Sequence, residues 1–157
     1  MSIAALPSVT VALCSFKHAD RLPRLAERLR AQASPVSFEI SAVNNISPDK
    51  ALDLVTLLQA DPGPSLKFVS EESLGIDVAR NRALREAEGS RFMVFLDVDE
   101  LALPGPLHAA HNTLEREAAD CAGGQAEVEF SGTTRSPWLS GVLLGFLGAV
   151  DHEPAAT

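Results

Sequence analysis

Short apolar runs alternate with amphipathic segments along the first two thirds of the chain. β-branched and apolar residues gather at 9–14, 38–43, 66–69 and 91–96, which is typical of short buried strands. Between these runs, apolar residues recur every three or four positions, as on one face of a helix. The alternation predicts a repeated strand–helix unit.

The helices are expected after each strand. The first begins with Asp20 as its N-cap and ends near Gln32. The others are expected around 52–58, 76–87 and 107–118, and a weak fifth strand is expected at 126–130. The predicted fold class is α/β, with a mostly parallel sheet and helices on both faces. The run at 92–96 is expected to be a buried, central strand.

Polar residues follow several of these strands. In an open parallel sheet, the ligand lies beyond the carboxyl ends of the strands. The polar residues at those ends should therefore meet at one rim, although they are far apart in the sequence. They are Ser15 and Lys17, then Asn44 and Asn45 in a polar turn, and then Asp97 and Asp99.

The sharpest chemical signal is the pair Asp97 and Asp99, two residues apart where a strand opens into a loop. Carboxylate oxygens suit Mg²⁺ or Mn²⁺, which often complete their coordination with water and substrate phosphate. A like-charged pair at a strand end is costly unless a cation or hydrogen-bond donors offset it. Helix-capping or solvated turn carboxylates are the alternative interpretation.

Two further groups could bind a nucleotide. Arg80 and Asn81 are expected to open the helix after Gly75, where an arginine suits phosphate; a solvated helix face is the alternative. Asn44 and Asn45 could hydrogen-bond a base or ribose edge, and a simple Asx turn is the alternative.

Composition narrows the classes of partner. The net charge is −8, with 13 basic and 21 acidic residues, which argues against a surface built for nucleic acid. Cys14 and Cys121 are interpreted as free thiols in a reducing compartment. The start of the chain lacks a charged export signal, and the apolar run 139–150 is too short to span a bilayer. The expected location is cytoplasmic, and membrane-surface contact and self-association through 139–150 stay open.

Four segments together resemble the family-2 glycosyltransferases, which have the GT-A fold. Each is similar to a family motif, and they occur in the family's order: Val11-Ala12-Leu13-Cys14-Ser15-Phe16-Lys17, Val43-Asn44-Asn45-Ile46-Ser47-Pro48-Asp49, Leu74-Gly75-Ile76-Asp77-Val78-Ala79-Arg80-Asn81-Arg82-Ala83-Leu84 and Phe95-Leu96-Asp97-Val98-Asp99-Glu100.

The resemblance implies an inverting, metal-dependent transfer of a sugar from a nucleotide-diphospho-sugar to an unknown acceptor. It implies that Asp97 lies near the ribose and the metal, and that Asp99 binds Mn²⁺ or Mg²⁺ bridging the diphosphate. The implied nucleotide-binding residues are Ser15, Phe16, Lys17, Asn44, Asn45, Arg80, Asn81 and Asp97.

The sequence departs from the family in several places. Asn44 stands where the family usually has an aspartate, and Ile46 replaces its turn glycine. Residues 1–130 are expected to form the nucleotide-sugar-binding domain, and 131–157 a divergent tail. Too little chain follows Asp99 to supply the family's acceptor half and general base, so the catalytic base is unassigned.

The sequence leaves two alternatives to a transferase. The first is a truncated, non-catalytic module that binds sugar nucleotides. The second is a haloacid-dehalogenase-like phosphatase with Asp97 as nucleophile. Glu100-Leu101 follows the aspartate pair where that phosphatase family usually has Gly-Thr, which disfavours the second alternative.

Overall fold

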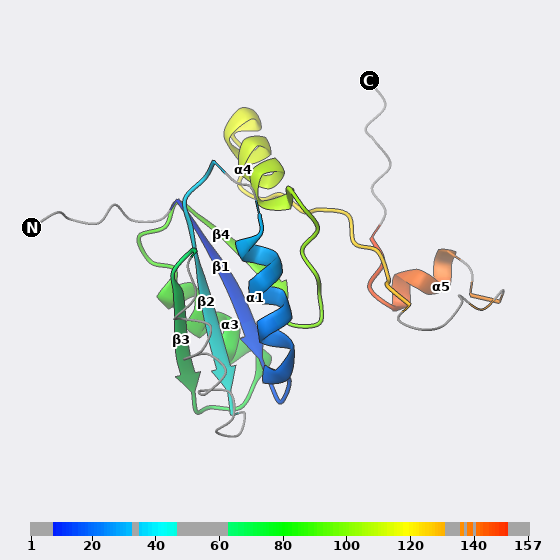
Figure 1. Cartoon of the computed structure of the whole chain (residues 1–157), viewed down its shortest axis with the longest axis horizontal. Helices are drawn as coiled ribbons and strands as arrows, with labels where there is room; N and C mark the ends of the chain where they lie inside the picture. Colours follow the sequence, from blue (N-terminus) through cyan, green and yellow to red (C-terminus); the bar gives the residue numbers. More distant parts are fainter. Residues whose placement is uncertain are drawn as a thin grey trace, which may run out of the picture. The chain divides into compact units, whose positions relative to one another are not determined.

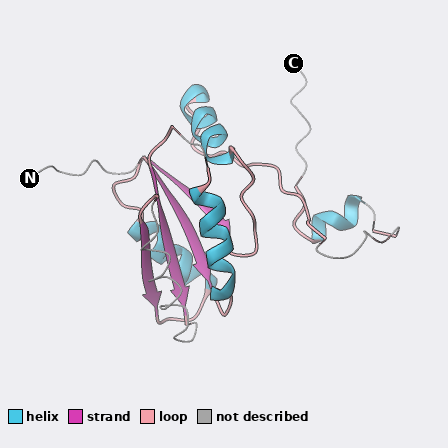
Figure 2. Ribbon diagram, viewed as in Figure 1, coloured by secondary structure: helices cyan, strands magenta, loops and turns pink. Residues whose placement is uncertain are grey.

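The computed structural model describes residues 8–32, 35–46, 63–130, 136, 138–139 and 141–150. The helix expected around 52–58 lies outside these residues. Strands and helices alternate in the described part as predicted (Figures 1 and 2). The elements are β1 (Val9–Ser15), η1 (Ala19–Arg21), α1 (Leu22–Arg30), β2 (Phe38–Asn45), β3 (Leu66–Glu71), α3 (Ile76–Glu86), β4 (Phe92–Asp97), α4 (Pro106–Glu117) and α5 (Gly141–Phe146).

The strands form one parallel sheet in the order β3-β2-β1-β4. The predicted α/β class is therefore confirmed. The expectation of a buried, central fourth strand is wrong, because β4 lies at an edge and, among the described strands, pairs only with β1. Its residues are half-buried, and Phe95 is 42% exposed. An apolar run alone does not distinguish an edge strand from an inner one.

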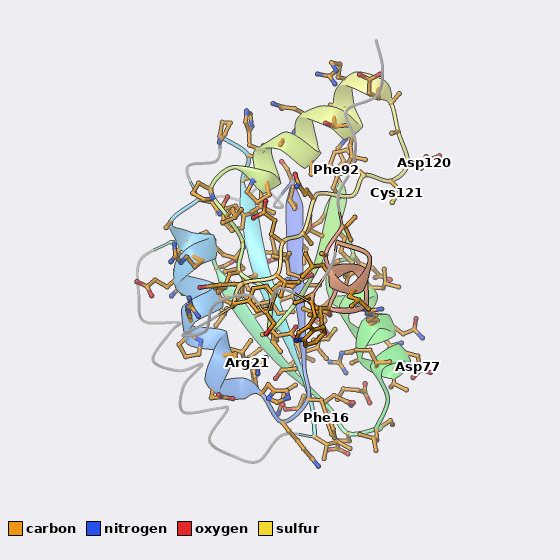
Figure 3. The ribbon with its side chains drawn as sticks, turned by 90° about the vertical axis from the view of Figure 1, so that its right-hand side faces the viewer. Phe16, Arg21, Asp77, Phe92, Asp120 and Cys121 are labelled. Atoms are coloured by element: carbon orange, nitrogen blue, oxygen red, sulfur yellow. The ribbon has the colours of Figure 1, made fainter. Side chains whose placement is uncertain are left out.

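Alternate residues of β1 face two different helices. Val11 and Leu13 belong to a core cluster with Leu25 and Leu29 of α1. Ala12 and Cys14 belong to a second cluster with Ala79 and Ala83 of α3. Side chains alternate across a strand, so one strand can serve both faces. Figure 3 shows the sheet between α1 and α3, which confirms that helices cover both faces.

The start of α1 differs from the prediction. Asp20 lies within the 3₁₀ turn η1, and Arg21 occupies the N-cap position without a capping side-chain hydrogen bond. Pro23 lies at the second helical position, where its missing N–H leaves one donor fewer to satisfy. A side-chain cap is therefore less needed here than the sequence pattern suggested.

The chain divides into two compact units, Met1–His111 and Asn112–Thr157. Within the second unit, the strand expected at 126–130 is reduced to an isolated antiparallel bridge between Ala126 and Val150. The functional boundary expected at residue 130 stays a prediction. None of the described helices has the length and apolar character that crossing a bilayer requires.

Candidate functional site

The carboxyl ends of the strands lie in register at one edge of the sheet. Ser15 is opposite Asn44, Cys14 is opposite Asp97, and Asn45 is opposite Glu71. The predicted rim of polar residues is therefore present. The turn expected at Asn44 and Asn45 is wrong, because both are the last residues of β2, and both are buried.

Asn45 holds the loop that leads from β3 to α3. Its Nδ2 donates to the carbonyl oxygens of Ser73 at 2.7 Å and of Glu71 at 3.2 Å. Its Oδ1 accepts from the N–H of Gly75 at 3.0 Å. Asn45 is only 3% exposed, so it holds the loop from the buried end of β2.

A pocket of about 350 Å³ lies between the end of β1 and the start of α3. The Ser15 hydroxyl is buried in its wall and has no hydrogen-bond partner among the described residues. A buried hydroxyl without a partner is costly unless a ligand or water satisfies it. Phe16 is 43% exposed and presents an aromatic ring at this end of the sheet, where Arg21 and Asp77 also lie (Figure 3). The pocket is lined by Cys14, Ser15, Phe16, Asn45, Leu74, Gly75, Ile76 and Ala79.

The other residues expected to bind the nucleotide lie outside this pocket. Lys17 is exposed, and its ammonium lies 4.9 Å from the centre of the Phe16 ring. Asn44 lines a smaller hollow of about 240 Å³ with Ile46, on the β3 side of the rim. Asn81 is exposed on α3. The structure thus separates Asn44 from Asn45, although they are adjacent in sequence.

Arg80 lies beside the first aspartate of the pair. It belongs to the second turn of α3, because the helix begins at Ile76; the expectation that Arg80 opens the helix is wrong. Its Nη2 is 3.5 Å from Asp97 Oδ1, and its guanidinium carbon is 5.7 Å from the centre of the Phe95 ring. Arg80 therefore partly neutralises Asp97.

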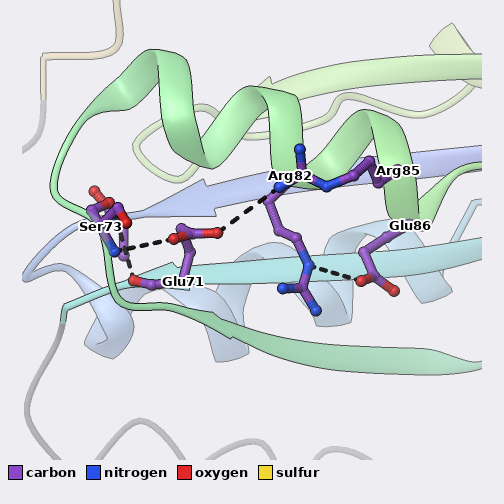
Figure 4. Close-up of polar contacts among 6 residues, drawn as sticks. Glu71, Ser73, Arg82, Arg85 and Glu86 are labelled. Carbon is purple, nitrogen blue, oxygen red and sulfur yellow. Dashed lines mark hydrogen bonds and ion pairs between the residues drawn. The ribbon is translucent and has the colours of Figure 1, made fainter.

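The neighbouring arginines of α3 have structural partners (Figure 4). Arg82 binds Glu86 at 2.8 Å on the same helix, and Arg85 lies 4.0 Å from Glu71 at the end of β3. Glu71 also accepts from the N–H of Ser73 at 2.9 Å. These contacts brace the loop before α3, and they leave Arg80 as the α3 arginine that faces the aspartate pair.

The turn that carries Asp97 and Asp99 is anchored by the residue between them. Val98 is 8% exposed and belongs to the core cluster on the α1 side. The Glu100 N–H donates to the Asp97 carbonyl oxygen at 3.0 Å, and Glu100 Oε2 accepts from the Asp97 N–H at 3.0 Å. The Glu100 carboxylate therefore closes the turn, while both aspartate side chains are left exposed.

The Asp97 and Asp99 carboxylates are the groups of this rim that could hold a hard divalent cation. Their exposed fractions are 53% and 65%, so both can be reached from solvent. Among the described residues, no group of three or more histidine, cysteine or acidic side chains is arranged to hold a metal. The pair fits the pattern in which Mg²⁺ takes one or two carboxylates and completes its shell with phosphate and water.

Cys14 lines the pocket and is the register partner of Asp97 on the neighbouring strand. Burial raises the pKa of its thiol; Arg80 opposes this effect and Asp97 adds to it. The group is therefore a neutral thiol at pH 7 and serves as an apolar part of the pocket wall.

Several residues of this site were not predicted from the sequence. Leu74 and Ile76 line the pocket, and the Arg21 guanidinium lies 3.8 Å from Asp99 Oδ2. The only sequence signal for the first two was their position beside Gly75. Arg21 carried no signal, because it lies outside the four family-like segments.

Residues 10–153 match the model of the family described as glycosyl transferase family 2. The chain belongs to this family. A search of curated proteins found no significant match.

Solved structures of TarS from S. aureus share the fold. The structure of TarS residues 1–349 is 25% identical with a TM-score of 0.64, and the match covers 72% of this chain and 34% of that one. The same fragment in complex with UDP is 25% identical with a TM-score of 0.64, covering 72% and 33%. A further TarS structure is 22% identical with a TM-score of 0.67, covering 83% and 23%.

These likenesses establish a GT-A fold for this member of family 2. The chain spans about a third of the length of the TarS 1–349 fragment that it matches.

Proposed function

We propose that the chain is the nucleotide-diphospho-sugar-binding part of a glycosyltransferase. The observation that carries this proposal is the placement of the 350 Å³ pocket beside the aspartate pair, since Cys14 of the pocket wall is the register partner of Asp97. The TarS fragment of the same fold has been crystallised with UDP and with UDP-GlcNAc. The nucleoside would lie in the pocket, with its diphosphate toward Asp97 and Asp99.

The pocket supplies complementary groups for a nucleoside. The unpartnered Ser15 hydroxyl can hydrogen-bond a polar edge of the base or ribose. The exposed ring of Phe16 offers a face on which a base can stack. Leu74 and Ile76 also line the pocket and add apolar surface. Asn45 does not contact the ligand in this proposal; it holds the loop that carries these two residues.

The diphosphate end of the ligand needs positive charge. Asp97 and Asp99 would hold Mn²⁺ or Mg²⁺, whose chemistry is to offset the charge that develops on the leaving diphosphate. Arg80 adds a guanidinium on the same side, 3.5 Å from Asp97. Such a group can donate to phosphate oxygens while still contacting the carboxylate.

Binding without transfer is the second candidate function, and the lack of an assigned general base among the described residues favours it. Inverting transfer needs a base within hydrogen-bond reach of the acceptor hydroxyl, worth about 10² to 10⁴ in rate. We assign that role to none of the described carboxylates. We therefore expect the isolated chain to bind or slowly hydrolyse a sugar nucleotide; efficient transfer to an acceptor would contradict this expectation.

Calorimetric titration with UDP and UDP-GlcNAc tests the proposal. With Mn²⁺ present, we expect binding that is at least tenfold tighter than with EDTA, because a cation held by Asp97 and Asp99 would offset the repulsion between these carboxylates and the diphosphate. In the Asp97→Asn variant, the affinity with Mn²⁺ should equal the affinity with EDTA. Glu88→Gln changes an exposed carboxylate just beyond the carboxyl end of α3, at the other end of that helix from Gly75; it is the matched control and should preserve the Mn²⁺-dependent gain in affinity. Equal affinity with Mn²⁺ and with EDTA would refute the metal assignment, and no binding under either condition would refute the nucleotide assignment.

A further inference from the structure

Each carboxylate of the aspartate pair has its own arginine. Arg80 of α3 lies 3.5 Å from Asp97, and Arg21, at the start of α1, lies 3.8 Å from Asp99. The two arginines thus approach the pair from helices on opposite faces of the sheet. Arg21 belongs to none of the four family-like segments.

We propose that Arg21 is a built-in counter-ion of Asp99 that a divalent cation displaces, after which its guanidinium is available to the diphosphate. This inference rests on the proposed function of the site. Without a cation, two exposed carboxylates in one turn repel each other, and a guanidinium offsets part of that cost. A cation held by Asp99 would compete with Arg21 for this carboxylate.

The two arginines are not equally easy to displace. Arg80 also lies over the Phe95 ring, at 5.7 Å from its centre, so it has a second interaction that holds it. The Arg21 contact with Asp99 is a single long ion pair between side chains that are 47% and 65% exposed. Ion pairs of this kind contribute little net free energy. Arg21 is therefore the arginine that gives way.

Only the side chain of Arg21 has to move. Its backbone is fixed in η1, where the Arg21 N–H donates to the His18 carbonyl oxygen at 3.1 Å. The next residue, Leu22, is 2% exposed and is part of the core. The guanidinium can rotate away from Asp99 while α1 stays in place. It then remains at the rim, where its planar donors match phosphate oxygens.

The competition is tested with Mn²⁺ alone, measured as free Mn²⁺ by electron paramagnetic resonance in a titration of the whole chain. We expect Arg21→Gln to bind Mn²⁺ about two- to fivefold more tightly than the unmodified chain, the range set by an exposed ion pair. Arg28→Gln removes the same charge from an exposed position further along α1 and should bind as the unmodified chain does. Equal affinities in all three proteins, no binding in any of them, or an equal gain in both variants would overturn the proposal.

The second half of the proposal is tested with UDP at saturating Mn²⁺. Arg21→Gln should then bind UDP severalfold more weakly, although it binds the metal more tightly. A merely structural role of Arg21 would not move the two affinities in opposite directions. Unchanged UDP affinity would refute the diphosphate contact. Failure of the unmodified chain to bind UDP would refute the proposed function instead, and the Mn²⁺ titration would still decide whether Arg21 competes for Asp99.

Discussion

The side-chain oxygen of Asn45 accepts a hydrogen bond of 3.0 Å from the N–H of Gly75, at the point where the β3–α3 loop becomes helix. The amide nitrogen of the same side chain donates to Ser73 in that loop. The last residue of β2 therefore holds one wall of the pocket in place. Only a side chain that both donates and accepts can make this set of contacts.

Replacing Asn45 with aspartate should loosen the pocket wall. The carboxylate can still accept from the Gly75 N–H. However, its second oxygen would take the place of the Asn45 amide nitrogen, which lies 2.7 Å from the Ser73 carbonyl oxygen, and two acceptors would then face each other. We expect a loss of about 1–3 kcal/mol in the free energy of unfolding, the usual cost of leaving a buried polar group unsatisfied, and weaker UDP binding. Urea denaturation and calorimetry measure the two effects. Gln125→Glu, the same amide-to-carboxylate change at an exposed position, is the control, and equal behaviour of the two variants would contradict this role of Asn45.

Gly75 should tolerate no side chain. Its φ of 148° and ψ of 139° lie in a region that L-residues rarely occupy. An added Cβ would also lie 2.6 Å from Asp77 Oδ1. Gly75→Ala is expected to cost about 1–3 kcal/mol in unfolding free energy. Gly123→Ala, where an added Cβ meets nothing within 4 Å, should be close to neutral in the same denaturation experiment. A neutral Gly75→Ala would show that the loop relaxes freely.

Cys14 should report ligand binding through its reactivity. Burial raises its pKa, so at pH 7 it reacts with iodoacetamide far more slowly than the exposed Cys121. In a Cys121→Ser variant, alkylation of Cys14 should accelerate with rising pH and should slow when UDP and Mn²⁺ are added, because Cys14 lines the pocket. Mass spectrometry follows the reaction. Rapid labelling at pH 7, or labelling unaffected by UDP, would be the contrary result.

The same pKa shift has a consequence for stability. Because the pKa of Cys14 is higher in the folded chain than in the unfolded chain, folding favours the neutral thiol. The stability contributed by this group is present at neutral pH and is lost as pH rises through the folded-state pKa.

The strands could be predicted from the sequence because their apolar runs are short and separate. The runs could not show the order of the strands in the sheet, because that order depends on pairing between segments far apart in the chain. For this reason β4 was expected at the centre, whereas it lies at an edge of the described sheet. The boundary of β2 was missed for a related reason. Asparagine is common in turns, so a turn was the natural prediction. The hydrogen bonds that Asn45 makes with the β3–α3 loop instead require a buried position at the end of a strand.

The site shows the same division between local and distant information. The rim of Ser15, Asn45 and Asp97 could be predicted, because parallel strands bring their carboxyl ends together whatever the sequence between them. The pairing of Arg21 with Asp99 could not, because it joins the start of α1 to the turn after β4, which lie far apart in the sequence. The separation of Asn44 from Asn45 could not be predicted either. Side chains alternate along β2, so the two asparagines line different hollows of the rim.

Val98 links the aspartate turn to the hydrophobic core, and this determines how the turn exchanges its amide protons. A loop that opens on its own exchanges rapidly, whereas a loop whose central side chain is buried opens only when the surrounding core does. The N–H groups of Asp97 and Glu100 are both hydrogen-bonded within the turn. Their protection against deuterium should therefore approach that of the strand residues of β1, so the carboxylate pair keeps its spacing for as long as this half of the core stays intact.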